Sequence, residues 1–279
     1  MTVRVVTDSA ADIPPDVAAA NGITVVPLTV RFGDDSYLSG VDLSADEFWD
    51  KLKTSSEAPA TAAPSAGDFQ ETYAKLIAEG ATGVVSIHLS SKLSATYQSA
   101  QVAAQAIDGT PIEVFDTLAV SAGTGLPAVM AAERAKAGAS AAEIASDLEA
   151  IRGRIRLYGA IDTLEYLRRG GRIGGAQALL GTMLKVKPII SLEDGVVEPV
   201  SRVRTRAKAI EQLGRFVADE KDNIERLVVL NSDAPDIDRL LEVVGQSFPV
   251  STSDVWAFGP IVGTHGGPGL LGLAFITKA

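Results

Sequence analysis

The sequence predicts an α/β protein of two lobes, and two patterns in the chain lead to this prediction. Short β-branched strands alternate with helices in the first half, which is typical of a parallel sheet with right-handed crossovers. In the second half, Glu193-Asp194-Gly195 separates two apolar runs and indicates a hairpin, which a purely parallel sheet lacks. We expect an N-terminal α/β domain with a parallel sheet over residues 1–155, a C-terminal α+β domain with a mixed sheet over residues 156–279, and a ligand buried between or within them.

The first lobe is predicted to open with a strand, a helix and a second strand. Residues 3–7 form a short apolar run, Pro14 and Pro15 then open a helix, and Gly22 ends it. The β-branched run over residues 23–30 predicts the second strand. Capping boxes, in which a serine precedes an acidic residue by three positions, predict further helices after Ser44, Ser65 and Ser140.

Residues 54–64 are predicted to form a loop. They are rich in Ser, Thr, Ala and Pro and follow neither the helical nor the strand period. The remaining predicted strands cover residues 84–88, 112–115, 189–192, 196–200, 227–230, 250–256 and 270–276.

The composition excludes several classes of function. A net charge of −10 argues against binding to the phosphate backbone of nucleic acids, which needs a basic patch. The chain has no cysteine, which removes disulfides, thiolate catalysis and Cys-based zinc sites. It also lacks a phosphate-binding loop, an H-E-x-x-H metal helix and a nucleophile elbow. We therefore expect no nucleic-acid partner, no metal and no cofactor.

The N-terminal apolar run is too short for the core of a signal peptide, and no uninterrupted apolar stretch is long enough to span a bilayer. The absence of cysteine suits a reducing compartment. We therefore expect a cytoplasmic protein without stable membrane insertion. If it handles lipid, it does so as a soluble carrier.

Three hydroxyl-rich segments are candidates for a ligand site. They cover residues 61–65, 90–94 and 116–117, where predicted strands lead into helices. Such loops share the carboxyl edge of a parallel sheet, which is the usual place for a ligand. The alternative is N-capping, since Ser and Thr before a helix often satisfy only their own backbone.

The two histidines receive different predictions. His265 lies in a glycine-rich loop over residues 259–269, which permits close approach of the backbone to a ligand and offers few side chains to pack against. We therefore favour a functional role for His265. His88 ends a strand, and we expect it to be a packing residue.

Three arginines, Arg168, Arg169 and Arg172, stand among four glycines in residues 164–175 of this acidic protein. The segment could hold a phosphate or face an acidic partner. The alternative is a solvated basic turn.

Five motifs resemble the DegV family, in the same order and over essentially the whole chain. Each motif is weak alone, but all five together are specific. They are Thr7-Asp8-Ser9 with Asp12, Thr61 to Ser65, Ser90-Ser91-x-Leu93-Ser94-x-Thr96-Tyr97, Leu167-x-x-Gly170-Gly171-Arg172-Ile173 and Gly263-x-His265-x-Gly267-Pro268-Gly269.

The resemblance implies a role in bacterial lipid metabolism. DegV proteins enclose one long-chain fatty acid, and several members present it to an ATP-binding fatty-acid kinase subunit, which makes acyl-phosphate for phospholipid synthesis. The chain would then be a non-catalytic, lipid-binding subunit. By motif, Thr61, Ser94 and His265 would bind the carboxylate, and Arg172 and Arg204 would lie at the kinase interface.

One loop departs from the family pattern, which usually reads Thr-Ser-Gln-Pro-Ser. This chain has Thr61-Ala62-Ala63-Pro64-Ser65, so two polar groups are missing and we expect fewer hydrogen bonds to the ligand.

A second hypothesis is a free-standing acyl or phosphoryl transferase, with His265 as base and Ser94 as nucleophile. The sequence argues against it, because it contains neither a recognisable nucleotide site nor an acid to orient the histidine.

Overall fold

The computed structural model describes residues 2–180 and 186–279. The strands of the N-terminal half are β1 (Val3–Asp8), β2 (Ile23–Val26), β3 (Thr29–Phe32), β4 (Asp35–Leu38), β5 (Pro59–Ala62), β6 (Gly83–His88) and β7 (Ile112–Asp116). Its helices are η1 (Ser9–Ala11), α1 (Pro15–Asn21), α2 (Ala45–Thr54), α3 (Ala66–Ala78), α4 (Thr96–Gln105), α5 (Ala122–Lys136) and α6 (Ala141–Arg152).

The C-terminal half begins with β8 and ends with β13. Its strands are β8 (Ile155–Ala160), β9 (Lys187–Glu193), β10 (Val196–Val203), β11 (Ile224–Asn231), β12 (Val255–Ala257) and β13 (Leu271–Thr277). Its helices are α7 (Glu165–Arg169), η2 (Gly174–Leu179), α8 (Arg206–Glu220), α9 (Ile237–Gly245), η3 (Thr252–Asp254) and α10 (Pro260–Gly266).

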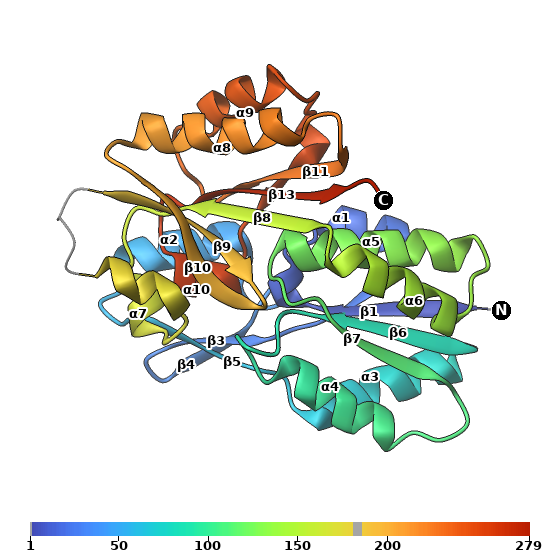
Figure 1. Ribbon diagram of the computed structural model, residues 1–279. Helices are drawn as coiled ribbons and strands as arrows, with labels where there is room; N and C mark the ends of the chain where they lie inside the picture. The colour runs from blue at the N-terminus through green and yellow to red at the C-terminus, as the bar shows by residue number, and fades with distance from the viewer. Residues whose placement is uncertain (1, 181–185) are drawn as a thin grey trace.

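The sheets confirm the predicted fold class. The N-terminal half contains a parallel sheet in the order β2-β1-β6-β7, and the C-terminal half a mixed sheet in the order β10-β9-β8-β13-β11-β12. In Figure 1, α3 and α4 cover one face of the parallel sheet, whereas α8 and α9 cover the outer face of the mixed sheet. No helix within the described ranges is both long and apolar enough to cross a membrane.

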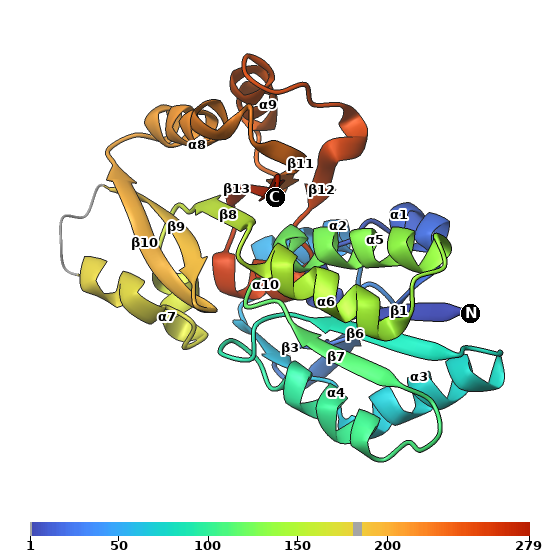
Figure 2. The same ribbon diagram turned by 45° about the vertical axis from the view of Figure 1, so that its right-hand side comes forward.

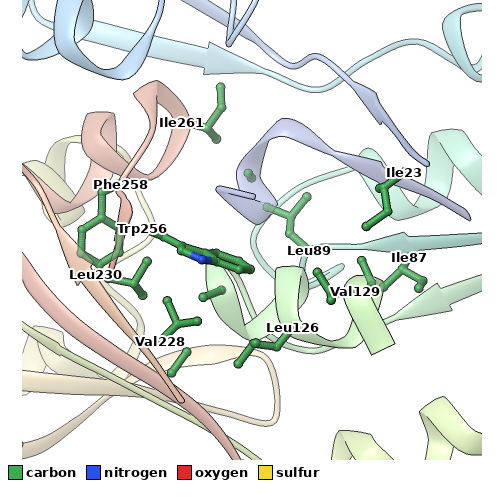
Figure 3. Packing of buried hydrophobic residues seen from close by; sticks show 14 of the residues in the cluster. Ile23, Ile87, Leu89, Leu126, Val129, Val228, Leu230, Trp256, Phe258 and Ile261 are labelled. Carbon is green, nitrogen blue, oxygen red and sulfur yellow. The ribbon is translucent and has the colours of Figure 1, made fainter. Parts of the chain in front are cut away.

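Helix α5 lies between the two sheets and joins their cores. Most of its residues are small or apolar and are buried. Figure 3 shows Leu126 and Val129 of α5 between Val228 and Trp256 of the C-terminal half and Ile87 of β6, and all five belong to one hydrophobic cluster. The boundary expected between residues 155 and 156 falls at the start of β8, and it stays a prediction.

The run over residues 23–30 was predicted as one strand, and the structure divides it into two. β2 pairs with β1 in the parallel sheet, whereas β3 pairs with β4 and β5 in a separate antiparallel sheet. Pro27 stands between them, and it has no N–H group with which to continue a ladder. The predicted loop over residues 54–64 contains β5, because pairing with β3 imposes an extended backbone that no local period indicates.

The structure confirms the predicted capping boxes and the predicted hairpin turn, which depend on residues close together in the sequence. Ser44, Ser65 and Ser140 each form the expected capping box. At the hairpin between β9 and β10, Asp194 and Gly195 have φ values of 49° and 82°, the left-handed pair that a tight two-residue turn requires.

Candidate functional site

An apolar cavity of about 230 Å³ lies between the two halves of the chain. The segments that follow β5 and β6 line one side, and β8, β9 and α10 line the other. Figure 2 shows α10 between the mixed sheet and the N-terminal half, with α7 nearby. A ligand with a large apolar part and few polar groups matches this lining. Its apolar residues include Leu89, Val120, Leu157, Ile190, Ile261 and Leu270.

Thr61 and His265 meet at the wall of this cavity. Thr61 lies in β5, and its hydroxyl oxygen is 3.0 Å from Nε2 of His265 near the end of α10. The segment around His265 was expected to be a loop, but Pro260 at the first helical position starts a short helix there. The structure therefore brings together two of the three residues that the sequence assigned to the carboxylate.

His265 is an uncharged side chain at neutral pH. Burial and, to a smaller extent, the nearby charge of Arg172 together lower its pKa from 6.5 to about 4. Its Nδ1 atom is buried and has no hydrogen-bond partner among residues 2–180 and 186–279. The imidazole can therefore act as a neutral hydrogen-bonding group beside the cavity.

Ser94 is the third expected carboxylate residue, and it also lines the cavity. Its hydroxyl is 2.9 Å from that of Thr96 and accepts the Thr96 backbone N–H at the start of α4. Ser94 thus combines a local hydrogen bond to the backbone with a place on the cavity wall. The segments around Thr61 and Ser94 converge on the cavity, but Thr61 lies in β5 of the antiparallel sheet and not at the carboxyl edge of the parallel sheet. Thr117 of the third segment bonds to the His88 carbonyl and lies outside this lining.

The two arginines expected at a partner interface occupy different environments. Arg172 lines the cavity and donates from Nε to the Leu93 carbonyl at 3.0 Å and from Nη1 to the Gly170 carbonyl at 2.7 Å. Arg204 is exposed between β10 and α8 and does not line the cavity. Arg172 is therefore part of the cavity wall, whereas Arg204 is a surface residue.

Comparison with known sequences identifies the family. The family model described as "Uncharacterised protein, DegV family" matches residues 2–278. A DegV domain-containing protein of Streptomyces coelicolor is 40% identical over 282 residues, which cover 99% of each chain. The chain belongs to the DegV family. This confirms the assignment expected from the five motifs.

Two solved DegV structures are similar to this chain throughout. A DegV family protein from Thermus thermophilus, described by its fatty acid binding, has a TM-score of 0.90 and 35% identity, and the match covers 99% of this chain and 100% of that one. DegV of Bacillus subtilis, described as a fatty acid binding protein, has a TM-score of 0.89 and 32% identity, and the match covers 100% of both chains.

The two alanines that depart from the DegV loop have different surroundings. Ala63 lines the cavity, whereas Ala62 is exposed and does not. Of these two alanines, only Ala63 therefore stands on the cavity wall.

Sequence reasoning missed Ser121 as a cavity residue. Its hydroxyl donates to the Asp12 carboxyl group at 2.5 Å, and its backbone has a positive φ of 56°. Asp12 also accepts the Gly259 N–H at 3.0 Å, and burial raises its pKa to about 7. The sequence offered only weak signals, namely Asp12 in the first DegV motif and a serine before α5.

The prediction that His88 is a packing residue is confirmed. Its Nδ1 is 2.9 Å from the Asp8 carboxylate and its Nε2 is 2.7 Å from the Ser86 hydroxyl, which accepts from Tyr73. These side chains are buried and lie outside the cavity lining. In the described part of the chain, no group of three or more His, Asp or Glu side chains is arranged to hold a metal ion.

Proposed function

We propose that this DegV-family chain binds one long-chain fatty acid, with the acyl chain in the apolar cavity and the carboxylate beside Thr61, Ser94 and His265. The observation that carries the proposal is the cavity itself, in which a few hydroxyl groups, the His265 imidazole and the Arg172 guanidinium stand on a mainly apolar wall. The two similar DegV structures are described as fatty-acid-binding, which supports the same class of ligand here.

Transfer free energies explain why the acyl chain lies against apolar residues and the carboxylate beside polar ones. Each buried methylene contributes about 0.8 kcal/mol, so a long acyl chain supplies the affinity against the cost of ordering it. A buried carboxylate is costly unless it is hydrogen-bonded. The hydroxyls of Thr61 and Ser94 can donate to it, and the Arg172 guanidinium provides the opposite charge on the same wall.

The second part of the proposal concerns presentation of the carboxylate. We propose that a separate ATP-binding fatty-acid kinase subunit phosphorylates it and that Arg172 and Arg204 face this partner. Arg204 is exposed and has no ion pair with any described residue, so it is available to an acidic surface or to the transferred phosphoryl group. Because ATP is the phosphoryl donor, the chain would act in the cytoplasm as a non-catalytic subunit.

The geometry gives less support to a transferase that uses Ser94 and His265. Nε2 of His265 contacts Thr61, and the described partner of the Ser94 side chain is Thr96. A base must reach the proton of its nucleophile through a hydrogen bond of ordinary length. Catalysis would therefore need a rearrangement that ligand binding does not need.

Organic extraction and mass spectrometry of the purified protein test the ligand. We expect one long-chain fatty acid per chain, or stoichiometric uptake of palmitate or oleate by lipid-free protein. If neither occurs, the proposed function is wrong. Incubation with ATP alone should leave the fatty acid unmodified, whereas acyl-phosphate formed without a second protein would favour the transferase.

A cognate kinase subunit tests presentation. Arg204→Ala should retain its lipid yet form little acyl-phosphate, and the wild-type reaction should weaken as salt screens the charges. Arg215→Ala is the matched control, because Arg215 is also exposed and has no described ion pair. Equal phosphorylation in both variants and the wild type would exclude Arg204 from the partner interface.

A further inference from the structure

α7 and α10 approach each other closely at two glycines. A Cβ atom at Gly170 would lie 2.1 Å from Nδ1 of His265, and one at Gly267 would lie 2.3 Å from the Tyr166 ring. Gly170 has a φ of −75°, which any residue adopts, and the three atoms nearest to a Cβ at this position all belong to the His265 ring, so the imidazole excludes a side chain there. Gly170 therefore forms a wall against one edge of the imidazole.

This wall indicates which ring nitrogen carries the proton. Nδ1 is buried without a hydrogen-bond partner in the described residues. One Cα hydrogen of Gly170 points along the direction of the absent Cβ, so a proton on Nδ1 would face another hydrogen across the same gap. A lone pair tolerates a C–H neighbour. The proton therefore belongs on Nε2, from which it is donated to the Thr61 oxygen over 3.0 Å.

The Thr61 hydroxyl then accepts from the imidazole and keeps its own proton for another partner. Thr61 lines the cavity, and His265 is the hydrogen-bond partner of its hydroxyl within the described ranges. A ligand atom that contacts this hydroxyl proton must be an acceptor, as a carboxylate oxygen is.

Hydrogen bonds from Arg172 and the backbone conformation of Gly171 hold the turn that contains Gly170. Arg172 donates to the carbonyls of Gly170 and Leu93, and Gly171 has the left-handed φ of 68° that reverses the chain. The positive charge of Arg172 also opposes protonation of His265. The same turn thus supplies both a wall and a charge to the imidazole.

We propose that the Gly170-Gly171-Arg172 turn is a positioning element that holds His265 as its Nε2–H tautomer, so that Thr61 presents its hydroxyl proton to the ligand. The identity of this ligand as a fatty-acid carboxylate rests on the proposed function, whereas the tautomer does not. Gly170 acts on the ligand only through His265 and Thr61, so it is a positioning residue.

The chain has two histidines, which makes nitrogen-15 NMR a direct test. Nδ1 of His88 donates to the Asp8 carboxylate, so the His88 Nδ1–H signal is an internal reference for a protonated Nδ1. Long-range proton–nitrogen spectra of the labelled protein at neutral pH, assigned with His265→Gln, should show Nδ1–H at His88 and Nε2–H at His265. Nδ1–H, imidazolium or an equal mixture at His265 would overturn the proposal.

Gly170→Ala tests the wall, and Gly153→Ala is its matched control. Both glycines end a helix with similar φ values of −75° and −69°, but a Cβ at Gly153 meets nothing within 4 Å. Gly170→Ala should alter the His265 tautomer signal and raise the Kd for a fluorescent fatty acid about tenfold or more, whereas Gly153→Ala should change neither. An unaltered tautomer and Kd in folded Gly170→Ala would contradict the proposal, and if this variant does not fold, the wild-type spectrum decides.

The two proposals fail in distinguishable ways. Nε2–H at His265 in a protein that takes up neither palmitate nor oleate would reject the proposed function and keep the role of the turn. Nδ1–H at His265 in a protein that carries fatty acid would reject the role of the turn and keep the function.

Discussion

Asp12→Asn should remove a pH dependence of stability that one buried carboxyl group creates. Asp12 is 9% exposed and has a left-handed backbone with φ of 53°. Burial raises its pKa from 3.8 to about 7, and its hydrogen bonds to Ser121 and Gly259 oppose this rise. Asparagine has the shape of the protonated acid, tolerates the left-handed conformation and stays uncharged as the pH rises.

The magnitude follows from the difference between the folded and unfolded pKa values. Because the folded value is higher, the folded protein keeps a proton that the unfolded chain releases. The stabilising contribution of Asp12 is therefore complete below about pH 4 and is lost as the pH rises through 7. Linkage gives about 1.4 kcal/mol per pH unit, so the wild type should lose roughly 2 to 3 kcal/mol through this group between pH 5 and pH 8.

Urea unfolding followed by fluorescence of the buried Trp49 and Trp256 measures this effect. The free energy of unfolding is compared at pH 5 and pH 8 with equal lipid content, because a bound ligand adds its own stabilisation. From pH 5 to pH 8, the free energy of unfolding of Asp12→Asn should rise relative to that of the wild type by roughly 2 to 3 kcal/mol. Asp16→Asn, at an exposed position, should show no such relative change. Parallel pH profiles for Asp12→Asn and the wild type would refute the reasoning.

Two further predictions concern the cavity. Thr61→Val removes the hydroxyl but keeps the shape of the side chain, so the Kd for a fluorescent fatty acid should rise about 10- to 150-fold, which is the usual cost of losing a hydrogen bond to a charged group. Thr61→Ser keeps the hydroxyl, so its Kd should stay near the wild-type value. Equal Kd values for both variants would locate the carboxylate elsewhere. Leu157 and Leu192 line both the apolar cavity and a second cavity of about 240 Å³, so Leu157→Ala should join the two spaces and shift preference toward longer acids. Competition among fatty acids of increasing length measures that shift, and an unchanged preference would mean that the acyl chain ends before Leu157.

The sequence by itself determined the features that depend on neighbouring residues. Ser44, Ser65 and Ser140 begin helices because each finds its capping partner three positions later. The turn at Asp194 and Gly195 needs left-handed conformations that these two residues tolerate. The order of the five motifs was sufficient to identify the DegV family.

Only the tertiary structure decided which distant residues share the site. Thr61 and His265 are 204 positions apart and meet because β5 pairs with β3 while α10 packs beside both. The contact of Gly170 with the imidazole depends on the close approach of α7 and α10. Such contacts depend on how whole elements pack across the core, and the local periodicity and capping of a sequence contain no information about that packing.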